Sequence, residues 1–504
     1  MTPDEIQNLK KAARLALQSG QVEDAERAAR RLIFEAPSAE SYDILSCALR
    51  NQERFDEALA ASNQALVLDP RNAPAMHNRA LVLARVGRTE EALRVYDTLV
   101  GGGLRAAPLW LNRGVALMDL ARVDEAEKWL ADGVRSWPAD AGLQNALAMV
   151  RWTRTGAPDF ASAFERAVEA NPDAVAARLR CADLLRRAGF TEKSEAMLRA
   201  GLARAPDTAM LLASLGTLLD EADRTEEALP FLRRAVALAP RVAIFDAALA
   251  NALLRQGQGD EALKFILPWR AAQPVNQEWI CYETTALRQI GEARYRELCD
   301  YELMVRPYDV EAPAGYANMA AFNEALSASL MRLHVLDAYP LDQSLRNGSQ
   351  TTRNLTQVAD PVVKAYIAAL DAPIRAYMDQ MRAHARIHPN HPWSGRVTGG
   401  YRIAGAWSVR LKANGFHVNH FHPAGWISSA YYVSLPPAVS RDDNAQQGWI
   451  KFGEPRWPTP GCGIERVVQP KEGRLVLFPS YMWHGTIAFD AGERLTAPFD
   501  AVPV

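Results

Sequence analysis

Small and apolar residues recur at a fixed interval along the first half of the chain. Eight of them mark the same point of successive units: Ala25, Ala58, Ala92, Ala126, Phe160, Ser194, Ala228 and Ala262. The first interval is 33 residues and the following six are all 34. A second small residue stands 12 positions before each marker, and proline stands 12 positions after most of them. Because small residues let helices approach closely and proline ends a helix, the pattern predicts stacked helix pairs, with each marker one turn into the second helix.

This interval is typical of tetratricopeptide repeats, each of which is one helix pair. We therefore predict a helical solenoid of about eight repeats over residues 1–275. Residues 276–304 continue the pattern only weakly, and we expect them to form capping helices, the last of them over 294–304. Since no Gly/Ser-rich linker follows, we expect the solenoid to be fixed against the domain that spans residues 305–504.

After residue 305 the pattern changes. Apolar residues at helical spacing predict helices over 323–334 and 361–383. Short runs of β-forming residues follow, separated by Gly, Pro and Asn: 399–403, 406–412, 417–421, 428–435, 449–452, 465–468, 474–478, 485–489 and 494–499. These runs predict an antiparallel sandwich or barrel of about eight strands, buttressed by the two helices. The predicted fold class is therefore α + β multidomain, a helical solenoid followed by a β domain.

Composition narrows the class of protein further. The chain has 57 Lys and Arg against 59 Asp and Glu, a net charge of -2 with interspersed signs, which argues against a nucleic-acid surface. No basic and apolar leader is visible at the start, and no apolar run approaches the roughly 18 residues that cross a bilayer. The five cysteines are scattered, which favours free thiols. We expect a cytoplasmic protein with no membrane or nucleic-acid partner.

Three histidines carry the candidate chemistry. His420 and His422 stand two apart in a run expected to be extended, so their imidazoles should share a face, and His484 lies in a later strand-like run. Non-heme Fe(II) oxygenases hold iron by three side chains on one face, usually two His and one carboxylate. We predict that all three histidines bind Fe(II), with the alternative that His422 only orients His420. No catalytic side chain is expected beyond this metal centre.

A group for an anionic cosubstrate follows His484. Arg494 and Thr496 lie ten and twelve residues later, and an arginine fork binds a carboxylate bidentately. We predict that both hold the distal carboxylate of 2-oxoglutarate. Tyr431 and Tyr432 are expected to point to opposite faces of their strand, so one of them should line the barrel interior. We assign Tyr432 to the cosubstrate, with its hydroxyl as donor and core packing as the alternative. A hairpin over 490–493 is expected to place Arg494 on the strand that neighbours His484.

Together these residues resemble a known family. The sequences His420-x-His422, 448–452, 470–480, His484 and Arg494 are similar to those of bacterial and phage 2-oxoglutarate/Fe(II) oxygenases related to prolyl hydroxylases, and 345–351 resembles a motif near the start of that domain. The resemblance covers roughly the last two hundred residues. It implies a double-stranded β-helix (jelly roll), Fe(II), 2-oxoglutarate, and O2 as cosubstrate.

The leading hypothesis is an Fe(II)/2-oxoglutarate-dependent dioxygenase, a hydroxylase whose substrate is a protein or peptide side chain recruited by the solenoid. The substrate class follows from analogy with prolyl and aspartyl hydroxylases that combine such a solenoid with an oxygenase domain. Two alternatives stay open. One is a tetratricopeptide scaffold with an inert barrel. The other is a cupin-like three-histidine metal enzyme that does not use 2-oxoglutarate, against which Arg494-Leu495-Thr496 argues.

Overall fold

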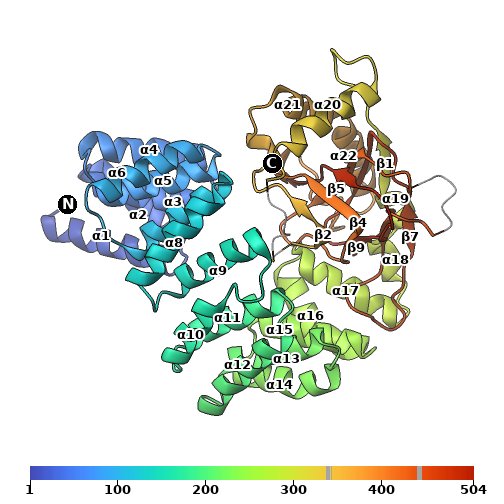
Figure 1. Ribbon diagram of the computed structural model, residues 1–504, viewed down its shortest axis with the longest axis horizontal. Helices are drawn as coiled ribbons and strands as arrows, with labels where there is room; N and C mark the ends of the chain where they lie inside the picture. Colours follow the sequence, from blue (N-terminus) through green and yellow to red (C-terminus); the bar gives the residue numbers. More distant parts are fainter. Residues whose placement is uncertain (336–340, 342, 440–444) are drawn as a thin grey trace. The chain divides into compact units, whose positions relative to one another are not determined.

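The computed structural model describes residues 1–335, 341, 343–439 and 445–504. They form two compact units, Met1–Val150 and Arg151–Val504 (Figure 1). The division lies inside helix α9 (Ala141–Thr155), so each unit contains several helix pairs. The domain boundaries expected at residues 275 and 304 stay a prediction. Among helices built from the described residues, none combines the length and apolar character needed to cross a membrane.

The first unit is a run of helix pairs with short turns. Its helices before α9 are α1 (Pro3–Gln18), α2 (Val22–Glu35), α3 (Ala39–Asn51), α4 (Phe55–Leu68), α5 (Ala73–Arg85), α6 (Thr89–Gly101), α7 (Ala107–Asp119) and α8 (Val123–Ser136). The repeat markers are buried between them: Ala25, Ala58, Ala92 and Ala126 are inaccessible to solvent. At Gly114 a side chain would collide with Leu130 of the paired helix. The predicted role of small residues in close helix packing is therefore confirmed here.

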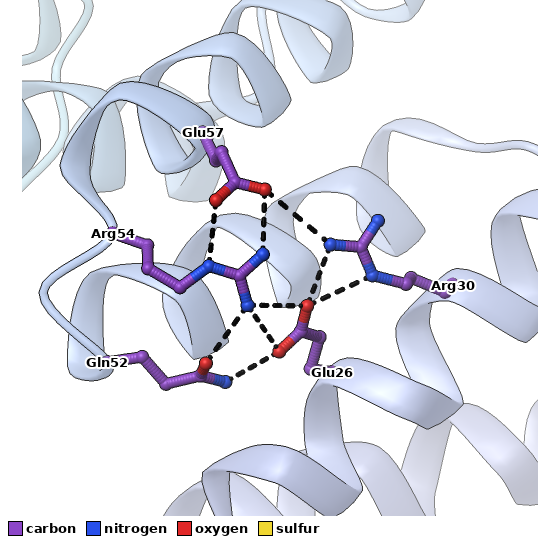
Figure 2. A network of polar contacts seen from close by, with 5 residues as sticks. All are labelled: Glu26, Arg30, Gln52, Arg54 and Glu57. Carbon is purple, nitrogen blue, oxygen red and sulfur yellow. Dashed lines mark hydrogen bonds and ion pairs between the residues drawn. The ribbon is translucent and has the colours of Figure 1, made fainter.

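Polar side chains join consecutive repeats on the surface of this unit (Figure 2). The Arg54 guanidinium donates to both Glu26 oxygens, at 2.8 and 2.9 Å, and to both Glu57 oxygens, at 2.8 and 2.7 Å. Arg30 and Gln52 also donate to Glu26. The same arrangement recurs in the second unit among Glu195, Arg199, Arg224 and Glu227. Ion pairs between neighbouring repeats thus recur along the solenoid, as the apolar contacts do.

This network makes the stability of the chain dependent on pH. Burial alone raises the pKa of Glu26, but hydrogen bonds from Gln52, Arg30 and Arg54 outweigh it and lower the pKa from 4.5 to about 2. The stabilisation is therefore present above pH 4.5 and is lost as the pH falls toward 2. We expect Glu26→Gln to lower the free energy of unfolding by about 1 kcal/mol at pH 7, given its surface position. Urea unfolding at several pH values should show this difference shrinking below pH 4.5.

The control for this prediction is Glu23→Gln, which removes the same charge from an exposed position on the same helix. We expect it to change the unfolding free energy by a few tenths of a kcal/mol at most. An effect of Glu26→Gln that is independent of pH, or equal to that of the control, would contradict the role assigned to the network.

The second unit begins with the remaining repeats. Their helices are α10 (Ser162–Ala170), α11 (Val175–Arg187), α12 (Thr191–Arg204), α13 (Ala209–Glu221), α14 (Thr225–Leu238), α15 (Ala243–Arg255), α16 (Gly259–Ala272) and α17 (Gln277–Gln289). Two details differ from the prediction. Phe160 precedes the short helix α10 instead of lying within it, and the cap is broken at Cys299 into α18 (Arg294–Leu298) and α19 (Tyr301–Met304). Both segments follow the packing of their buried aromatic residues, Phe160, Tyr295 and Tyr301, instead of the repeat period.

Antiparallel strands make up the rest of this unit. They are β1 (Arg306–Asp309), β2 (Leu345–Gln350), β3 (Tyr401–Ala406), β4 (Val409–His417), β5 (Ile427–Ser434), β6 (Ile450–Phe452), β7 (Arg466–Val468), β8 (Arg474–Pro479), β9 (His484–Thr486), β10 (Arg494–Thr496) and β11 (Phe499–Pro503). The large sheet has the order β1-β8-β5-β10-β4-β2, with β11 pairing β5 and β3, and the small sheet has the order β7-β6-β9. The predicted antiparallel β domain is therefore confirmed, with eleven strands among the described residues instead of about eight.

Helices cover the large sheet. They are α20 (Met319–Met331), α21 (Pro361–Ala369) and α22 (Asp371–Ala385), so the single helix expected over 361–383 is interrupted at Leu370. The buried Tyr366 donates its hydroxyl to the Ala497 carbonyl, and Tyr377 donates to the Met304 carbonyl at 2.7 Å. These contacts attach the helices to the strands and to the end of the solenoid.

The last repeats and the β domain share one hydrophobic core. Ile280 and Cys281 of α17 belong to the same buried cluster as Phe452 and Phe478 of the two sheets. The Trp483 indole donates to the Thr285 hydroxyl at 3.0 Å. The expected attachment without a flexible linker is therefore confirmed within the second unit.

Candidate functional site

The structure brings the three predicted histidines together, although not through a strand. The run 417–421 is not a strand; β4 ends at His417, and a single antiparallel bridge joins His420 to His484, with N–O distances of 2.8 and 2.9 Å. The His422 amide donates to the Ser480 carbonyl at 2.8 Å. The backbone bends at Asn419, yet the bridge and this hydrogen bond hold both histidines beside the start of β9.

Each ring is anchored through Nδ1. The carbonyls of Val418 and Met482 lie 2.8 and 2.9 Å from Nδ1 of His420 and His484, respectively. Since a carbonyl only accepts, each Nδ1 must carry the proton and each Nε2 must be bare in the neutral ring. The His420 and His422 Nε2 atoms lie 3.1 Å apart, and the potential ligand atoms of the three rings all lie within 4.8 Å of one another. Three acceptor nitrogens thus converge on one point.

The electrostatics keep two of these rings uncharged. Burial lowers the pKa of both His420 and His484 well below 6.5, and the neighbouring imidazoles lower each further. Neutral imidazoles with converging lone pairs are the ligands that a divalent transition metal binds. The residues present therefore fit a metal ion such as Fe(II), and the ligand roles of His420, His422 and His484 stay a prediction.

Asp500 is a functional candidate that the sequence analysis missed. Its carboxylate oxygens lie 2.6 and 2.7 Å from His422 Nδ1, and it also accepts a hydrogen bond from the Ser428 hydroxyl at 2.7 Å. A carboxylate in this position fixes the ring and its tautomer, and it makes the opposite nitrogen a stronger ligand. The only sequence signal was an acid between the apolar residues Phe499 and Ala501 of the last strand.

The predicted cosubstrate residues lie on the large sheet. The expected hairpin is wrong, because β9 pairs with β6 of the small sheet, whereas β10 pairs with β4 and β5, with Arg494 opposite Leu411. The chain crosses from one sheet to the other between Thr486 and Arg494. The two sheets thus bring Arg494 and His484 to the walls of one cavity from different directions.

Arg494 is a buried cation that pairs with no carboxylate of the described residues. Its side chain is 3% exposed, and its Nη1 donates to the Gly448 carbonyl at 2.8 Å, but its Nε has no hydrogen-bond partner among the described residues. Burial lowers the pKa of this guanidinium. An unpaired buried cation is costly, so the position favours an anionic ligand.

Tyr432 lies beside Arg494 and, like it, has a buried donor without a hydrogen-bond partner among the described residues. The guanidinium carbon of Arg494 is 5.1 Å from the centre of the Tyr432 ring. The Tyr432 hydroxyl is buried and has no partner in the described part of the chain, whereas Tyr431 donates to Asn323 at 2.8 Å. Tyr432 is therefore the tyrosine with a free donor. Its role in binding a cosubstrate, like that of Arg494, stays a prediction.

Thr496 and His417 complete the wall. The Thr496 hydroxyl lines the cavity and makes only a long contact, 3.4 Å, with the Val409 carbonyl. His417 also lines the cavity, with its Nδ1 2.9 Å from the Ser344 hydroxyl. The cavity has a volume of about 770 Å³ and extends from Arg494 and Thr496 past the three histidines. The cavity therefore leaves space next to the three histidines and next to Arg494.

Comparison with known proteins identifies both parts of the chain. Residues 405–500 match the family described as "Putative 2OG-Fe(II) oxygenase". This range includes the site residues His417, His420, His422, His484, Arg494 and Asp500. Tetratricopeptide-repeat families match residues 10–75, 44–108, 77–141, 179–243 and 221–280. The chain thus carries tetratricopeptide repeats, followed by a C-terminal region that matches the family described as "Putative 2OG-Fe(II) oxygenase", which is the architecture that the sequence predicted. The antiparallel sheets of this region, together with the helical repeats before it, confirm the predicted fold class of a helical solenoid followed by a β domain.

Individual relatives match the repeats. A stretch of 114 residues is 32% identical to "Protein STIP1 homolog" of Dictyostelium discoideum; it is 22% of this chain and 20% of that protein, so the chain spans about a fifth of the relative's length. A tetratricopeptide repeat protein from Parabacteroides merdae is 17% identical over 56% of this chain and 99% of its own, with a TM-score of 0.37. YrrB, described as a TPR protein with an unusual peptide-binding site, is 18% identical over 44% of this chain and 97% of its own, with a TM-score of 0.23.

Proposed function

We propose that this protein is an Fe(II)- and 2-oxoglutarate-dependent dioxygenase that hydroxylates a protein or peptide side chain recruited by its repeats. One observation carries the proposal: a single cavity is lined by three converging imidazoles and by a buried arginine that lacks a carboxylate among the described residues. The first group fits iron and the second fits the distal carboxylate of 2-oxoglutarate. When bound, these cofactors supply the oxidative decarboxylation that lets O2 hydroxylate a C–H bond.

The residues of the chain have separate roles in this proposal. His420, His422 and His484 would hold the metal through Nε2, while Asp500 keeps His422 in the required tautomer. Arg494 and Tyr432 would donate to the cosubstrate carboxylate from the large sheet. The buried floor of the cavity excludes water from the reacting atoms.

The repeats support a macromolecular substrate. Tetratricopeptide repeats generally mediate protein or peptide binding. Helices α11 and α13 of the solenoid contribute Arg186, Leu218 and Glu221 to the wall of the same cavity that contains the histidines. A peptide segment bound along these helices would lie next to the metal site. A freely diffusing small substrate would not need a helical surface beside that site.

The proposal is tested by incubating the purified full-length protein with Fe(II), 2-oxoglutarate and O2. We expect slow formation of succinate without any added substrate, and its loss when iron is removed by a chelator. Parallel assays with Mn(II) in place of Fe(II) control for simple metal stabilisation. Binding of iron without any consumption of 2-oxoglutarate would favour the cupin-like enzyme, and absence of both would favour a scaffold with an inert barrel.

A further inference from the structure

A second cavity joins the inner face of the solenoid to the metal site. It has a volume of about 430 Å³ and is lined from the solenoid by α11, α13, α15 and α17. The two cavities share the residues Arg186, Glu221, His420, Phe421, Arg456 and Trp457. A ligand lying along the four helices would therefore reach His420 without leaving the protein surface.

The far wall of this groove is a segment of the oxygenase domain, residues 453–465, between β6 and β7. We call it the docking segment. Its Gly453 carbonyl accepts from Arg288 at 2.8 Å, its Pro460 carbonyl accepts from Gln289 at 3.1 Å, and Glu465 pairs with Arg296 at 3.0 Å. These contacts hold the docking segment against α17 and α18.

The docking segment is also tied to the metal site. The Asn419 amide donates to the Pro455 carbonyl at 3.0 Å and to Glu454 at 2.9 Å. Asn419 precedes His420, and Pro455 precedes Arg456, so one hydrogen bond joins the neighbours of these two residues. Arg456 therefore has a fixed place beside the metal site.

Arg456 is a cation that forms no ion pair with any described residue. Its guanidinium lies 4.9 Å from the centre of the Trp457 ring and makes no ion pair or hydrogen bond with any described residue. The residue is exposed but lines both cavities. Desolvation lowers the pKa of its guanidinium most; the Glu221 carboxylate opposes this, and the nearby Arg346 and Arg186 lower it further. A cation in a concave site of this kind favours an anion.

The acids that line the groove do not form an ion pair with Arg456, because each already pairs or hydrogen-bonds with another side chain. Glu221 and Asp183 pair with Arg186, and Asp220 pairs with Arg255 at 2.8 Å. Glu278 accepts a hydrogen bond from Tyr282, and burial raises the pKa of its carboxyl. Of these acids, Glu221 attracts Arg456 but forms its ion pair with Arg186. Arg456 thus has no ion pair of its own among the described residues at the junction of the two cavities.

We infer that the groove formed by α11, α13, α15, α17 and the docking segment binds an extended peptide whose aspartate or glutamate side chain pairs with Arg456 next to the residue that enters the metal site. This inference rests on the proposed function for the fate of the peptide, but not for its binding. Exposed Met210 and Ile244 on the helices provide apolar contact for the remaining side chains.

The test uses three pools of nine-residue peptides, acetylated and amidated so that no terminal charge contributes. Glutamate, glutamine or lysine is fixed at the central position, and the other positions are mixed. Retention of each pool on the immobilised full-length protein is measured by mass spectrometry at low salt. We expect the glutamate pool to be retained about tenfold more than the lysine pool, as suits one charge pair in a cleft.

Substitution of Arg456 provides the decisive comparison. Arg456→Glu should abolish or reverse the preference, and Arg456→Lys should retain most of it. Arg180→Glu makes the same charge change on α11, at an exposed residue that lines neither cavity, and should leave the preference unchanged. Circular dichroism checks that each variant is folded.

Equal retention of all pools, retention of none, or an undiminished preference in folded Arg456→Glu would each overturn the inference. The assay needs neither iron nor 2-oxoglutarate. If the peptide preference is absent but succinate forms, the oxygenase proposal stands and the binding inference fails. If succinate does not form but the preference depends on Arg456, the binding inference stands and the oxygenase proposal fails.

Discussion

Anaerobic preparations of His420→Ala and His484→Ala are expected to bind no Fe(II), whereas the unmodified protein binds about one ion per chain. Each of these rings directs a bare Nε2 atom toward the others while its Nδ1 donates to a backbone carbonyl. Removing either ring leaves two nitrogen donors, which rarely hold a labile divalent ion. Iron content is measured by colorimetric chelation after gel filtration.

The control is His388→Ala, because His388 is an exposed histidine outside the walls of the described cavities. This variant should keep its iron. Unchanged iron stoichiometry in both His420→Ala and His484→Ala would remove the metal from the place assigned to it.

Two further substitutions separate the roles of His422 and Asp500. Asp500→Asn keeps the size of the side chain but replaces the carboxylate at His422 Nδ1, and outer partners of this kind typically change metal affinity by about 10- to 100-fold. His422→Asp would restore the usual carboxylate and should keep iron. Loss of iron in His422→Asp together with full affinity in Asp500→Asn would contradict the role given to His422.

The repeat architecture could be predicted because its cause is local. A close helix–helix contact admits only small side chains at one point per repeat, so Ala25, Ala58 and their equivalents appear in the sequence at the repeat period. The irregular elements escaped prediction for the opposite reason. Phe160 sits at the expected position, but it lies in the turns that precede α10.

The strands that were missed lack a local signal. The sequence of β1 begins Arg306-Pro307, and β2 contains Asn347 and Gly348, which are poor strand formers. They become strands because β8 and β4 offer them antiparallel partners from distant parts of the sequence. Only the assembled sheets supply these partners.

The site shows the same limit. The His–x–His spacing predicted correctly that His420 and His422 lie together, but the cause is a bend, one backbone bridge and one backbone hydrogen bond, not the alternation of a strand. Arg494 was assigned from its residue type. The prediction that its strand pairs with the strand of His484 was wrong, because the order of strands in a sheet is not encoded locally. Asp500 became a candidate only because the structure places it on His422 Nδ1. Arg456 became one because the structure shows no ion pair for it among the described residues.

Arg494→Ala is expected to weaken 2-oxoglutarate binding severely while leaving iron binding intact. The guanidinium is buried beside the Tyr432 ring, and Gly448 is its described hydrogen-bond acceptor. Truncating one partner of a buried charge pair typically costs 2–5 kcal/mol or more, roughly 30- to 5,000-fold in affinity. Arg494→Lys keeps the charge but loses the fork, so its effect should be smaller. Isothermal titration with Mn(II)-loaded protein under nitrogen measures both affinities without turnover.

Tyr432→Phe separates the two donors of this pocket. It removes the buried hydroxyl that has no partner among the described residues but keeps the ring that packs against Arg494. If that hydroxyl donates to the cosubstrate carboxylate, its removal should weaken 2-oxoglutarate binding by about 1.5–3 kcal/mol, roughly 10- to 150-fold. Arg410→Ala serves as the control, because Arg410 pairs with Glu493, the residue that immediately precedes β10. Should Arg494→Ala bind 2-oxoglutarate as tightly as the unmodified protein, Arg494 would be structural, and the three histidines would then fit the cupin-like enzyme better than an oxygenase.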